Sequence, residues 1–299
     1  VMTASIARSA RYTSAMTLFT ERLNAAAIRN RSLVCIGLDP WGPSMPIDDI
    51  AAFTRAIIEA TADLVCAYKP NYAFYEAEGL PGLHALKATI DAIPDGVPVI
   101  LDAKRGDIGS TATAYAKAAF EAWNADAVTL SPYMGGDTIE PFLEYEDRGV
   151  LILTRTSNPG GRDFEDLPIA YDEGSAQAYG GTSRPLYEHV VERAVEWNTR
   201  SNIGLVVGAT APEELQRIRG LAPTMPILIP GVGTQGGDLE AAVRYGVDAD
   251  GLGAIINSSR GIIFAGNGPD FADAARAAAQ ALRDQINAER DKLGLRWPS

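Results

Sequence analysis

Eight short apolar runs alternate with longer amphipathic or alanine-rich stretches, and this alternation limits the possible folds more than any other feature of the chain. The runs are nearly continuous in hydrophobicity and rich in β-branched residues, a pattern that favours parallel strands buried on both faces. They lie at residues 32–38, 63–68, 97–101, 126–130, 150–154, 203–207, 226–229 and 249–256.

The stretches between the runs carry signals that are typical of helix starts. Pro46 opens residues 46–61, Pro212 stands ahead of two glutamates, and Pro269 precedes the alanine-rich C-terminal stretch. A further helix is predicted at about residues 14–30, ahead of the first run, where it could close the floor of a barrel.

Eight strands that alternate with helices are the number found in an α/β protein of the (β/α)8 TIM-barrel type. A doubly wound open sheet is the alternative, but no run is followed by the GxGxxG turn that binds dinucleotides in that fold. The 299 residues contain no linker and no shift in composition that would divide them. We therefore predict a single barrel domain over residues 1–299, of which residues 1–13 form a flexible tail.

One connection is much longer than the others and lies between about residues 156 and 184. It is rich in glycine, aspartate and serine, and it lacks a helical or strand period over most of its length. Loops of this length inside a compact domain are usually lids or binding loops. We therefore predict an active-site loop at residues 156–184.

Charge and composition argue against several classes of partner. The chain has 26 Lys and Arg residues and 38 Asp and Glu residues, so its net charge is −12. This negative charge disfavours nucleic acid or an anionic membrane as the main partner. No uninterrupted apolar stretch of about 18 residues is present, so a membrane span is not expected. Cys35 and Cys66 lie inside apolar runs and are expected to be buried, unpaired thiols, which fits a cytoplasmic protein.

Charged, polar and glycine-rich residues directly follow several of the predicted strands. In a barrel these positions share one rim, and that rim is where active sites form. They are Asp39, Lys69, Asp102, Lys104, Asp107, Ser157, the glycine-rich residues 230–237 with Gln235, and Arg260. Their repeated occurrence on one rim is more informative than any single motif.

Asp102 and Lys104 are the most informative of these residues. Because they are two residues apart at a strand end, we expect their side chains to point to the same side, into the barrel mouth. With Lys69 and Asp39 from neighbouring strands they would form an array in which carboxylates stay ionised and ammonium groups keep their protons. Such an array suits the stabilisation of a carbanion by an ammonium group that then protonates it. A purely structural ion-pair network is the alternative.

Several rim residues also have a plainer interpretation. Asp107 and Thr111 could serve only the start of a helix, where the helix dipole favours a carboxylate and a hydroxyl can bind backbone N–H groups. Asp39 could be a turn residue and Lys69 a solvated loop lysine, since a proline follows each of them.

An anion site is predicted after the seventh and eighth runs. The glycine pairs in residues 231–237 offer backbone N–H groups in a turn that leads into a helix. Arg260, just past the next strand, could bind the same anion in a charge-assisted pair. Barrels commonly hold phosphate at these two loops, although tight turning alone would also explain the glycines.

Histidine-dependent and zinc chemistry are not expected. His84 and His189 lie in helix-like stretches away from the rim, so a Ser-His or Cys-His nucleophile is disfavoured. No Cys/His pair has the spacing of a zinc site.

Taken together, these rim motifs resemble orotidine 5′-phosphate decarboxylases, and in particular the subgroup with KPN and TSN motifs. The matching segments follow the family's order over nearly the whole chain. They are GLDP at 37–40, AYKPNYAFYEAEG at 67–79, LDAKRGDIGST at 101–111, SPYMGGDTIEPF at 131–142, RTSNPGG at 155–161, PGVGTQGGD at 230–238 and INSSRGIIFA at 256–265.

The resemblance implies a (β/α)8-barrel homodimer with active sites at the subunit interface, and neither a metal nor an organic cofactor. The implied reaction is decarboxylation of orotidine 5′-monophosphate to UMP, the last step of de novo pyrimidine nucleotide synthesis. Lys104 would protonate C6 after CO₂ leaves, and Asp102 would lie beside the departing carboxylate. Lys69 and Asp39 would hold the ribose and complete the charged array.

The resemblance also implies the remaining binding contacts. Asp107 and Thr111 would reach the ribose from the partner subunit, and Ser157 would contact the amide edge of the pyrimidine. Gln235 and Arg260 would bind the phosphate. Ser259 just before Arg260 and Thr234 just before Gln235 are departures from the family pattern, but neither removes one of these side chains.

Two other functions stay open at this point. A sugar-phosphate lyase of the same superfamily would use the carboxylates of the DxKxxD motif to bind Mg²⁺, although the KPN and TSNPG segments and Gln235 speak against it. A nucleotide-binding barrel without catalysis is the other alternative. A pure binder, however, gains nothing from the carboxylates of Asp102 and Asp107 beside an anionic ligand.

Overall fold

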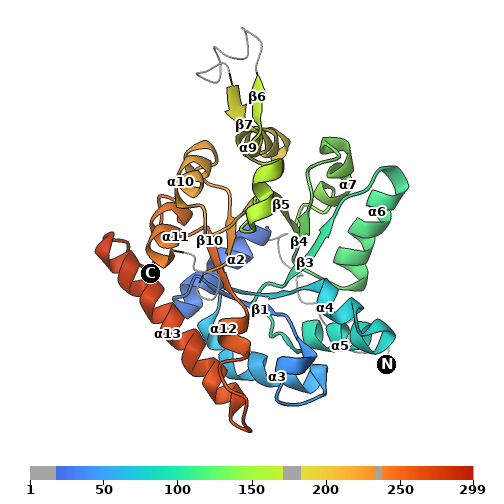
Figure 1. Cartoon of the computed structure of the whole chain (residues 1–299), viewed down its shortest axis with the longest axis vertical. Helices are drawn as coiled ribbons and strands as arrows, with labels where there is room; N and C mark the ends of the chain where they lie inside the picture. Colours follow the sequence, from blue (N-terminus) through green and yellow to red (C-terminus); the bar gives the residue numbers. More distant parts are fainter. Residues whose placement is uncertain (1–17, 171–182, 233–237, 299) are drawn as a thin grey trace.

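A computed structural model describes residues 18–170, 183–232 and 238–298, so the tail predicted at residues 1–13 lies outside the described residues. Eight parallel strands form one curved sheet in the order β2-β1-β10-β9-β8-β5-β4-β3 (Figure 1). The two end strands of this order, β2 and β3, are joined by parallel bridges that close the ring. The predicted (β/α)8 barrel is therefore confirmed, and the doubly wound open sheet is excluded.

Each predicted apolar run overlaps one strand of the barrel. The strands are β1 (Val34–Leu38), β2 (Ala67–Pro70), β3 (Ile100–Arg105), β4 (Ala127–Leu130), β5 (Gly149–Arg155), β8 (Ile203–Val207), β9 (Ile227–Pro230) and β10 (Ala254–Ser258). Strands β2 and β10 begin four and five residues after the starts of their runs, at 67 against 63 and at 254 against 249. The 3-10 helix η2 (Ala62–Leu64) precedes β2, and Gly251 and Gly253, both with positive φ, form a turn before β10.

Helices surround the ring of strands (Figure 1). They are α3 (Ile50–Thr61), α4 (Tyr72–Glu76), α5 (Gly79–Ala92), α6 (Gly109–Lys117) with its π-helical extension η3 (Ala118–Ala122), α7 (Glu140–Leu143), α9 (Leu186–Trp197), α10 (Pro212–Leu221), α11 (Leu239–Gly246), α12 (Arg260–Ile263) and α13 (Phe271–Lys292). Helix α10 begins at Pro212, as predicted. Helix α3 begins four residues after Pro46, because the Asp49 side chain accepts a hydrogen bond from the Ala52 N–H (3.0 Å) and caps the helix there.

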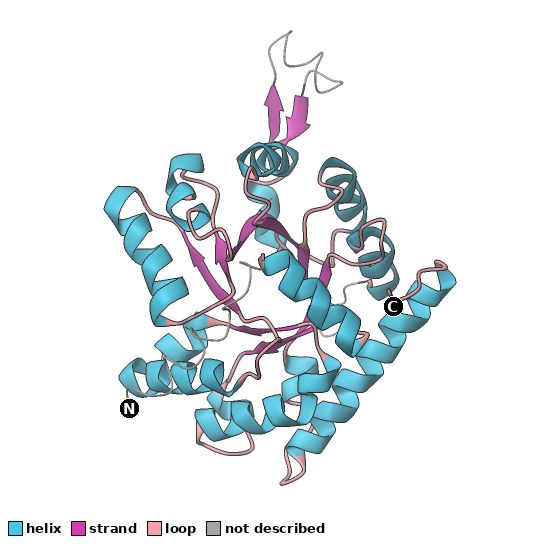
Figure 2. Ribbon diagram, turned by 180° about the vertical axis from the view of Figure 1, so that it is seen from behind, coloured by secondary structure: helices cyan, strands magenta, loops and turns pink. Residues whose placement is uncertain are grey.

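Helix α2 (Phe19–Asn30) covers the end of the barrel at which the strands begin. It lies behind the strands in Figure 1 and therefore faces the viewer in the reversed view of Figure 2. Phe19 packs on Gly149 at the start of β5, where a Cβ would lie 2.4 Å from a ring carbon. Arg22 forms an ion pair with the buried carboxylate of Asp126 (3.2 Å). The predicted floor helix is thus confirmed over its described residues.

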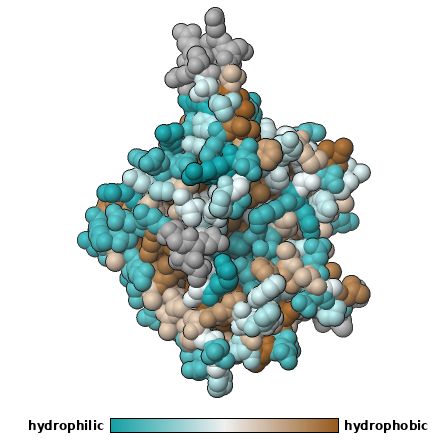
Figure 3. Space-filling view, in the orientation of Figure 1, coloured by the Kyte–Doolittle hydropathy of each residue, from teal (hydrophilic) through white to brown (hydrophobic). Residues whose placement is uncertain are grey.

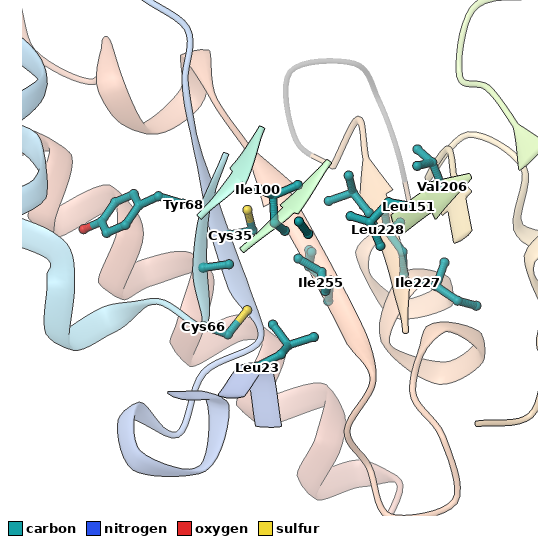
Figure 4. Close-up of a cluster of buried hydrophobic side chains, with 14 of the residues drawn as sticks. Leu23, Cys35, Cys66, Tyr68, Ile100, Leu151, Val206, Ile227, Leu228 and Ile255 are labelled. Atoms are coloured by element: carbon teal, nitrogen blue, oxygen red, sulfur yellow. The ribbon is translucent and has the colours of Figure 1, made fainter. Parts of the chain in front are cut away.

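A cluster of buried apolar side chains connects the strands to one another and to the floor helix (Figure 4). It includes Leu23 of α2 together with residues of strands on opposite arcs of the ring, such as Ile100 and Ile255. Cys35 and Cys66 are buried, free thiols within this cluster, as predicted. Burial raises the pKa of Cys35 to about 12, so this thiol stays protonated and chemically inert at neutral pH.

The long segment at residues 156–184 contains more regular structure than its sequence predicts. It begins with the 3-10 helix η5 (Pro159–Asp163), and its strands β6 (Pro168–Ala170) and β7 (Ser183–Pro185) pair in antiparallel fashion. The two strands project away from the barrel (Figure 1). The sequence does not indicate these two strands, because strands of three residues are too short to carry a visible alternation.

Hydrophilic side chains predominate on the face shown in Figure 3, and hydrophobic residues form scattered groups between them. Among the helices that the structure describes, none is both long and apolar enough to cross a lipid bilayer. Helix α13 has 22 residues, but charged side chains occur along its whole length.

Substitution of Gly149 by alanine should destabilise the protein, because the new methyl group would clash with Phe19 of the floor helix. We expect the free energy of unfolding to fall by about 1–3 kcal/mol, as for other overpacked cores, measured by urea denaturation. The matched control is Gly220→Ala at an exposed position of α10, where an added Cβ meets no atom within 4 Å. That variant should be neutral or slightly stabilised. Equal stability of both variants would contradict the packing of α2 on β5.

Candidate active site

Three charged side chains meet where β2 and β3 end, at the rim opposite the floor helix. Asp102 accepts hydrogen bonds from Lys69 Nζ at Oδ2 (2.9 Å) and from Lys104 Nζ at Oδ1 (2.5 Å). The bridge between Asn71 and Asp102 holds the two strand ends side by side. Lys69 and Asp102 are only 4% and 8% exposed, whereas half of the Lys104 side chain is in contact with solvent. The structure thus brings together three of the predicted site residues.

Burial and mutual contact shift the pKa values of the two buried groups. Burial raises the pKa of the Asp102 carboxyl. The charges and hydrogen bonds of Lys69 and Lys104 lower this pKa by more than burial raises it, so it lies well below its usual range. Burial lowers the pKa of Lys69, but the carboxylates of Asp102 and Asp39 raise it by more, so it lies above its ordinary value. Both groups are therefore ionised at neutral pH.

Lys104 reaches Asp102 by a route that simple strand alternation does not predict. Between Leu101 and Arg105, four residue steps of β3 are matched by two steps of β4, so β3 contains a bulge. Lys104 lies in this bulge with a φ of 47°, in the left-handed region that residues other than glycine rarely adopt. Such a conformation costs about 1–3 kcal/mol and is found mainly at functional sites. The bulge re-aims the ammonium group toward Asp102.

Thr129 of β4 holds this bulge in place. Its Oγ1 accepts hydrogen bonds from the backbone N–H groups of Ala103 (3.0 Å) and Lys104 (2.9 Å) and donates one to Oδ1 of Asp102 (3.1 Å). Nothing in the sequence marks this residue as part of the site. A threonine inside an apolar run is indistinguishable from the β-branched residues that strands favour for packing alone.

A cavity of about 170 Å³ opens beside the charged array, at the ends of β1, β2, β9 and β10. It brings Asp39 and Arg260 together with Lys69 and Asp102, as the rim motifs predict. The residues that line it are Asp39, Lys69, Asn71, Asp102, Pro230, Gly231, Val232, Asn257, Ser258, Ser259 and Arg260. The two asparagines and two serines among them belong to motifs recognised in the sequence, but none of the four was predicted to have a role of its own.

The polar groups of the cavity suit an anionic ligand that carries hydroxyl groups. The ammonium group of Lys69 and the guanidinium of Arg260 supply positive charge. Oδ1 of Asp39 is buried and makes no hydrogen bond with the described residues. A buried acceptor without a donor is costly, and a ligand hydroxyl would satisfy it.

Asp107 and Thr111 lie on the same rim but do not line this cavity. Oδ1 of Asp107 accepts a hydrogen bond from the N–H of Ile108 (2.8 Å), just ahead of α6. Thr111 is exposed in the first turn of that helix. Within one chain, therefore, these two predicted residues lie outside the cavity that Asp39, Lys69, Asp102 and Arg260 line.

Ser157 follows the end of β5 and also lies outside the residues that line the cavity. Thr210 Oγ1 donates a hydrogen bond to its carbonyl oxygen (3.3 Å). Gly208, just after β8, allows the two backbones to approach, since a Cβ on Gly208 would lie 2.7 Å from the Cα of Ser157. Ser157 is thus held between the ends of β5 and β8.

Glu165 ties the start of the long segment to the barrel. Its Oε2 accepts hydrogen bonds from Arg155 Nη1 (2.6 Å) and the Thr156 N–H (3.0 Å), and its Oε1 accepts one from Thr156 Oγ1 (2.7 Å). Arg155 is buried, so this pair is shielded from solvent. The clamp fixes the backbone directly before Ser157.

Gln235, the other predicted phosphate ligand, lies outside the described residues, as does most of the glycine-rich turn. Gly231 and Val232, which begin the turn, line the cavity together with Arg260. Gly231 has a φ of 97°, a conformation that favours glycine at this point of the turn.

A second, larger cavity of about 850 Å³ lies between the loop after β4 and helix α9. Its lining is mainly apolar and includes Tyr133, Phe164, Val190 and Trp197. No residue of the Lys69–Asp102–Lys104 array lines it. The chemistry is therefore assigned to the smaller cavity, which is lined by Lys69 and Asp102 of the array and borders Lys104 through its contact with Asp102.

Metal ligation has little support from the arrangement of carboxylates. Within residues 18–170, 183–232 and 238–298, no three His, Cys, Asp or Glu side chains come close enough to hold a metal ion. Both oxygens of Asp102 already accept hydrogen bonds from ammonium groups.

The fold and the site together define an enzyme of the (β/α)8-barrel class that works with ionised side chains at the mouth of the barrel. Residues 32–277 match the family model described as orotidine 5′-phosphate decarboxylase / HUMPS family. The chain belongs to this family.

Individual relatives agree with the family match. A protein named orotidine 5′-phosphate decarboxylase from Ralstonia nicotianae is 52% identical to this chain, over 91% of this chain and 99% of its own length. A protein of the same name from Roseiflexus castenholzii is also 52% identical, over 90% of this chain and 97% of its own length. The solved OMP decarboxylase of Leishmania donovani has a TM-score of 0.79 and 43% identity, covering 92% of this chain and 99% of its own. The UMP synthase of that organism has a TM-score of 0.81 and 45% identity over 92% of this chain, which spans 57% of the synthase.

Asp102→Asn should destabilise the protein in a pH-dependent way, because it leaves the buried Lys69 without its counter-charge. We expect a loss of about 3–5 kcal/mol in the free energy of unfolding at neutral pH. A carboxyl whose folded pKa is depressed stabilises the fold above its unfolded pKa of about 3.9 and loses that contribution as pH falls through the folded pKa. The difference between wild type and variant should therefore be constant between about pH 5 and pH 8 and shrink below about pH 4.

Urea denaturation at a series of pH values measures this difference. The control is Asp91→Asn, which removes an exposed ion pair with Lys87 on α5 and should cost less than about 1 kcal/mol. A difference for Asp102→Asn that did not change on acidification would contradict the depressed carboxyl pKa.

Proposed function

We propose that this protein decarboxylates orotidine 5′-monophosphate to UMP, the last step of de novo pyrimidine nucleotide synthesis. The observation that carries the proposal is a carboxylate, Asp102, held ionised between Lys69 and Lys104 at the mouth of the barrel. Relatives that share 52% identity over about nine tenths of the chain bear the name of this activity.

The reaction needs an array of this kind. When CO₂ leaves C6 of the pyrimidine, the electrons of the broken bond stay on C6 as a vinylic anion that the ring does not delocalise. Fixed charges in a dry site must therefore stabilise the developing charge. Lys104 is the lysine of the array whose side chain is half exposed, so it stabilises this anion and then transfers its proton to C6. Asp102, beside the substrate carboxylate, repels its negative charge and so favours loss of this group as neutral CO₂, with the charge left on C6.

The substrate contacts follow from the cavity and the family motifs. Asp39 and Lys69 hold the ribose, Ser157 contacts the amide edge of the pyrimidine, and Arg260 with Gln235 binds the phosphate. Binding energy from the phosphate, remote from the reacting carbon, supports closure of the loops around the ring. The reaction itself needs neither a metal nor an organic cofactor.

The active form in this proposal is a homodimer with shared sites. Asp107 and Thr111 lie on the rim, outside the cavity of their own chain, where they are available to the ribose bound in a partner subunit. The protein acts as one barrel domain in the cytoplasm, a compartment that suits its two unpaired thiols.

A magnesium-dependent sugar-phosphate lyase is the principal alternative function. It would need both carboxylates of the DxKxxD motif for the metal. In this chain Asp102 is neutralised by two lysines, and an oxygen of Asp107 accepts a hydrogen bond from the next backbone N–H. These contacts favour the decarboxylase.

The first test mixes the purified protein with orotidine 5′-monophosphate and excess EDTA and follows the ultraviolet absorbance of the substrate. We expect rapid loss of absorbance with UMP as product, unaffected by the chelator. No loss, but turnover of a keto sugar phosphate after Mg²⁺ is restored, would identify the lyase instead. Inactivity in both assays would favour a nucleotide-binding barrel without catalysis.

The second test mixes two inactive variants, Lys104→Ala and Asp107→Ala. Each alone should lose at least about a thousandfold in kcat, because one lacks the proton donor and the other the partner's carboxylate. Lys104→Ala should still bind UMP. After random exchange of subunits, about half of the dimers are heterodimers, and each heterodimer has one intact site out of two. An equimolar mixture should therefore regain about a quarter of the wild-type activity.

The control for this experiment is Lys87→Ala, an exposed lysine of α5, which should keep wild-type kinetics. Substantial turnover by Lys104→Ala alone would refute its role as proton donor. Two inactive variants that fail to complement after subunit exchange would refute the shared site.

A further inference from the structure

Asn257 is a buried polar residue of the cavity whose amide oxygen has no partner among the described residues. It is the fourth residue of β10, is 6% exposed and lines the cavity with Asp39 and Arg260. Its Oδ1 is buried and makes no hydrogen bond with any described residue. Buried amide oxygens are normally paired, so an orphaned one that borders a cavity points to a ligand.

The position of Asn257 in the sheet places it between two proposed parts of the substrate site. Strand β10 lies between β1 and β9, and Asn257 is in register with Cys35 of β1 and Pro230 of β9. Asp39, proposed to hold the ribose, follows β1, and Arg260, proposed to bind the phosphate, closely follows β10. The amide therefore faces the region between ribose and phosphate.

Ser259 orients this amide. Asn257 Nδ2 donates a hydrogen bond to Ser259 Oγ (3.4 Å), which leaves Oδ1 as the atom without a partner among the described residues. The serine side chain is itself seated over Gly37 of β1, where a Cβ would lie 1.8 Å from the serine Oγ. No other residue type would fit at position 37 without displacing Ser259.

The unpartnered atom is an acceptor, so its ligand must donate a hydrogen bond. A nucleoside monophosphate has few donors, because its phosphate is ionised at neutral pH and only the ribose hydroxyls and the base N–H carry protons. The neighbours of Asn257 in the cavity are the proposed ribose and phosphate contacts rather than Ser157, the proposed base contact. A ribose hydroxyl is therefore the donor within reach.

We propose that Asn257 is a substrate-binding residue whose Oδ1 accepts a hydrogen bond from a ribose hydroxyl of the nucleotide. This inference rests on the proposed function. Asp39 Oδ1 is a second buried acceptor on the same cavity wall that lacks a partner among the described residues. The cavity thus presents two acceptors to a sugar with two vicinal hydroxyls, which selects ribonucleotides over their deoxy analogues.

The test compares wild type with Asn257→Leu, which keeps the approximate shape of the side chain and removes both polar atoms. The substrates are orotidine 5′-monophosphate and its 2′-deoxy and 3′-deoxy analogues. With the natural substrate, we expect Asn257→Leu to lower kcat/KM by about tenfold or more. With the analogue that lacks the bound hydroxyl, wild type and variant should be equal within about twofold, because the interaction is already gone.

Two outcomes would overturn the proposal. The same fold-loss with all three substrates would show a structural role and overturn the proposal, as would no loss with any of them. Asn287→Leu on α13, which removes an asparagine that contacts Arg31 and Trp297 outside the site, is the matched control and should leave all three values unchanged. Should Asn257→Leu fail to fold, Asn257→Ala gives the same comparison.

Wild-type turnover in this experiment separates failure of the inference from failure of the proposed function. A wild-type protein that does not decarboxylate the natural substrate refutes the function itself. In that case the dissociation constants of UMP, 2′-deoxy-UMP and 3′-deoxy-UMP, measured by calorimetry for wild type and Asn257→Leu, still test the hydroxyl contact. Equal effects of the variant on all three ligands would again overturn it.

Discussion

The site depends on one buried carboxylate that is bonded to two ammonium groups. Lys69 and Lys104 both favour the ionised form of the buried Asp102, and Asp102, together with Asp39, favours the charged form of the buried Lys69. This pairing fixes the relative position of β2 and β3, the two strands whose bridges close the ring. The ion pair between Lys69 and Asp102 therefore spans the seam at which the barrel closes.

The two lysines differ in backbone conformation and exposure, and this difference suits them to different tasks. Lys69 lies within a regular, fully buried strand, so its ammonium group is a fixed charge. Lys104 lies in a bulge with a left-handed backbone, and half of its side chain is in contact with solvent. Thr129 stabilises this conformation through both neighbouring N–H groups. A proton donor must move its proton to a reacting carbon, and the more exposed, re-aimed lysine is the one suited to do so.

Much of this architecture could be predicted from the sequence because its signals are local. A run such as residues 203–207 is typical of a buried strand, and Pro212 marks the helix start that follows it. Parallel strands all end on one rim, so the residues that follow them could be assigned to one site from their order in the chain alone. The meeting of Asp102 with Lys104 was also predicted, but from strand alternation, whereas a bulge produces it. Bulges depend on pairing with a neighbouring strand, which no local pattern reveals.

The residues that the sequence did not indicate share a property: their polar atoms act from inside apolar strands. Thr129 lies inside the apolar run at 126–130, and Asn257 directly follows the run at 249–256, in a motif that suggested no role for its amide; the structure places both residues within strands. Their roles depend on what the closed ring places beside them. The neighbour of Thr129 is the carboxylate of Asp102, and the neighbour of Asn257 is the cavity. A buried threonine that finds a partner completes the fold. A buried asparagine whose acceptor finds none within the described chain indicates a missing donor, and in a barrel mouth that donor comes from the substrate.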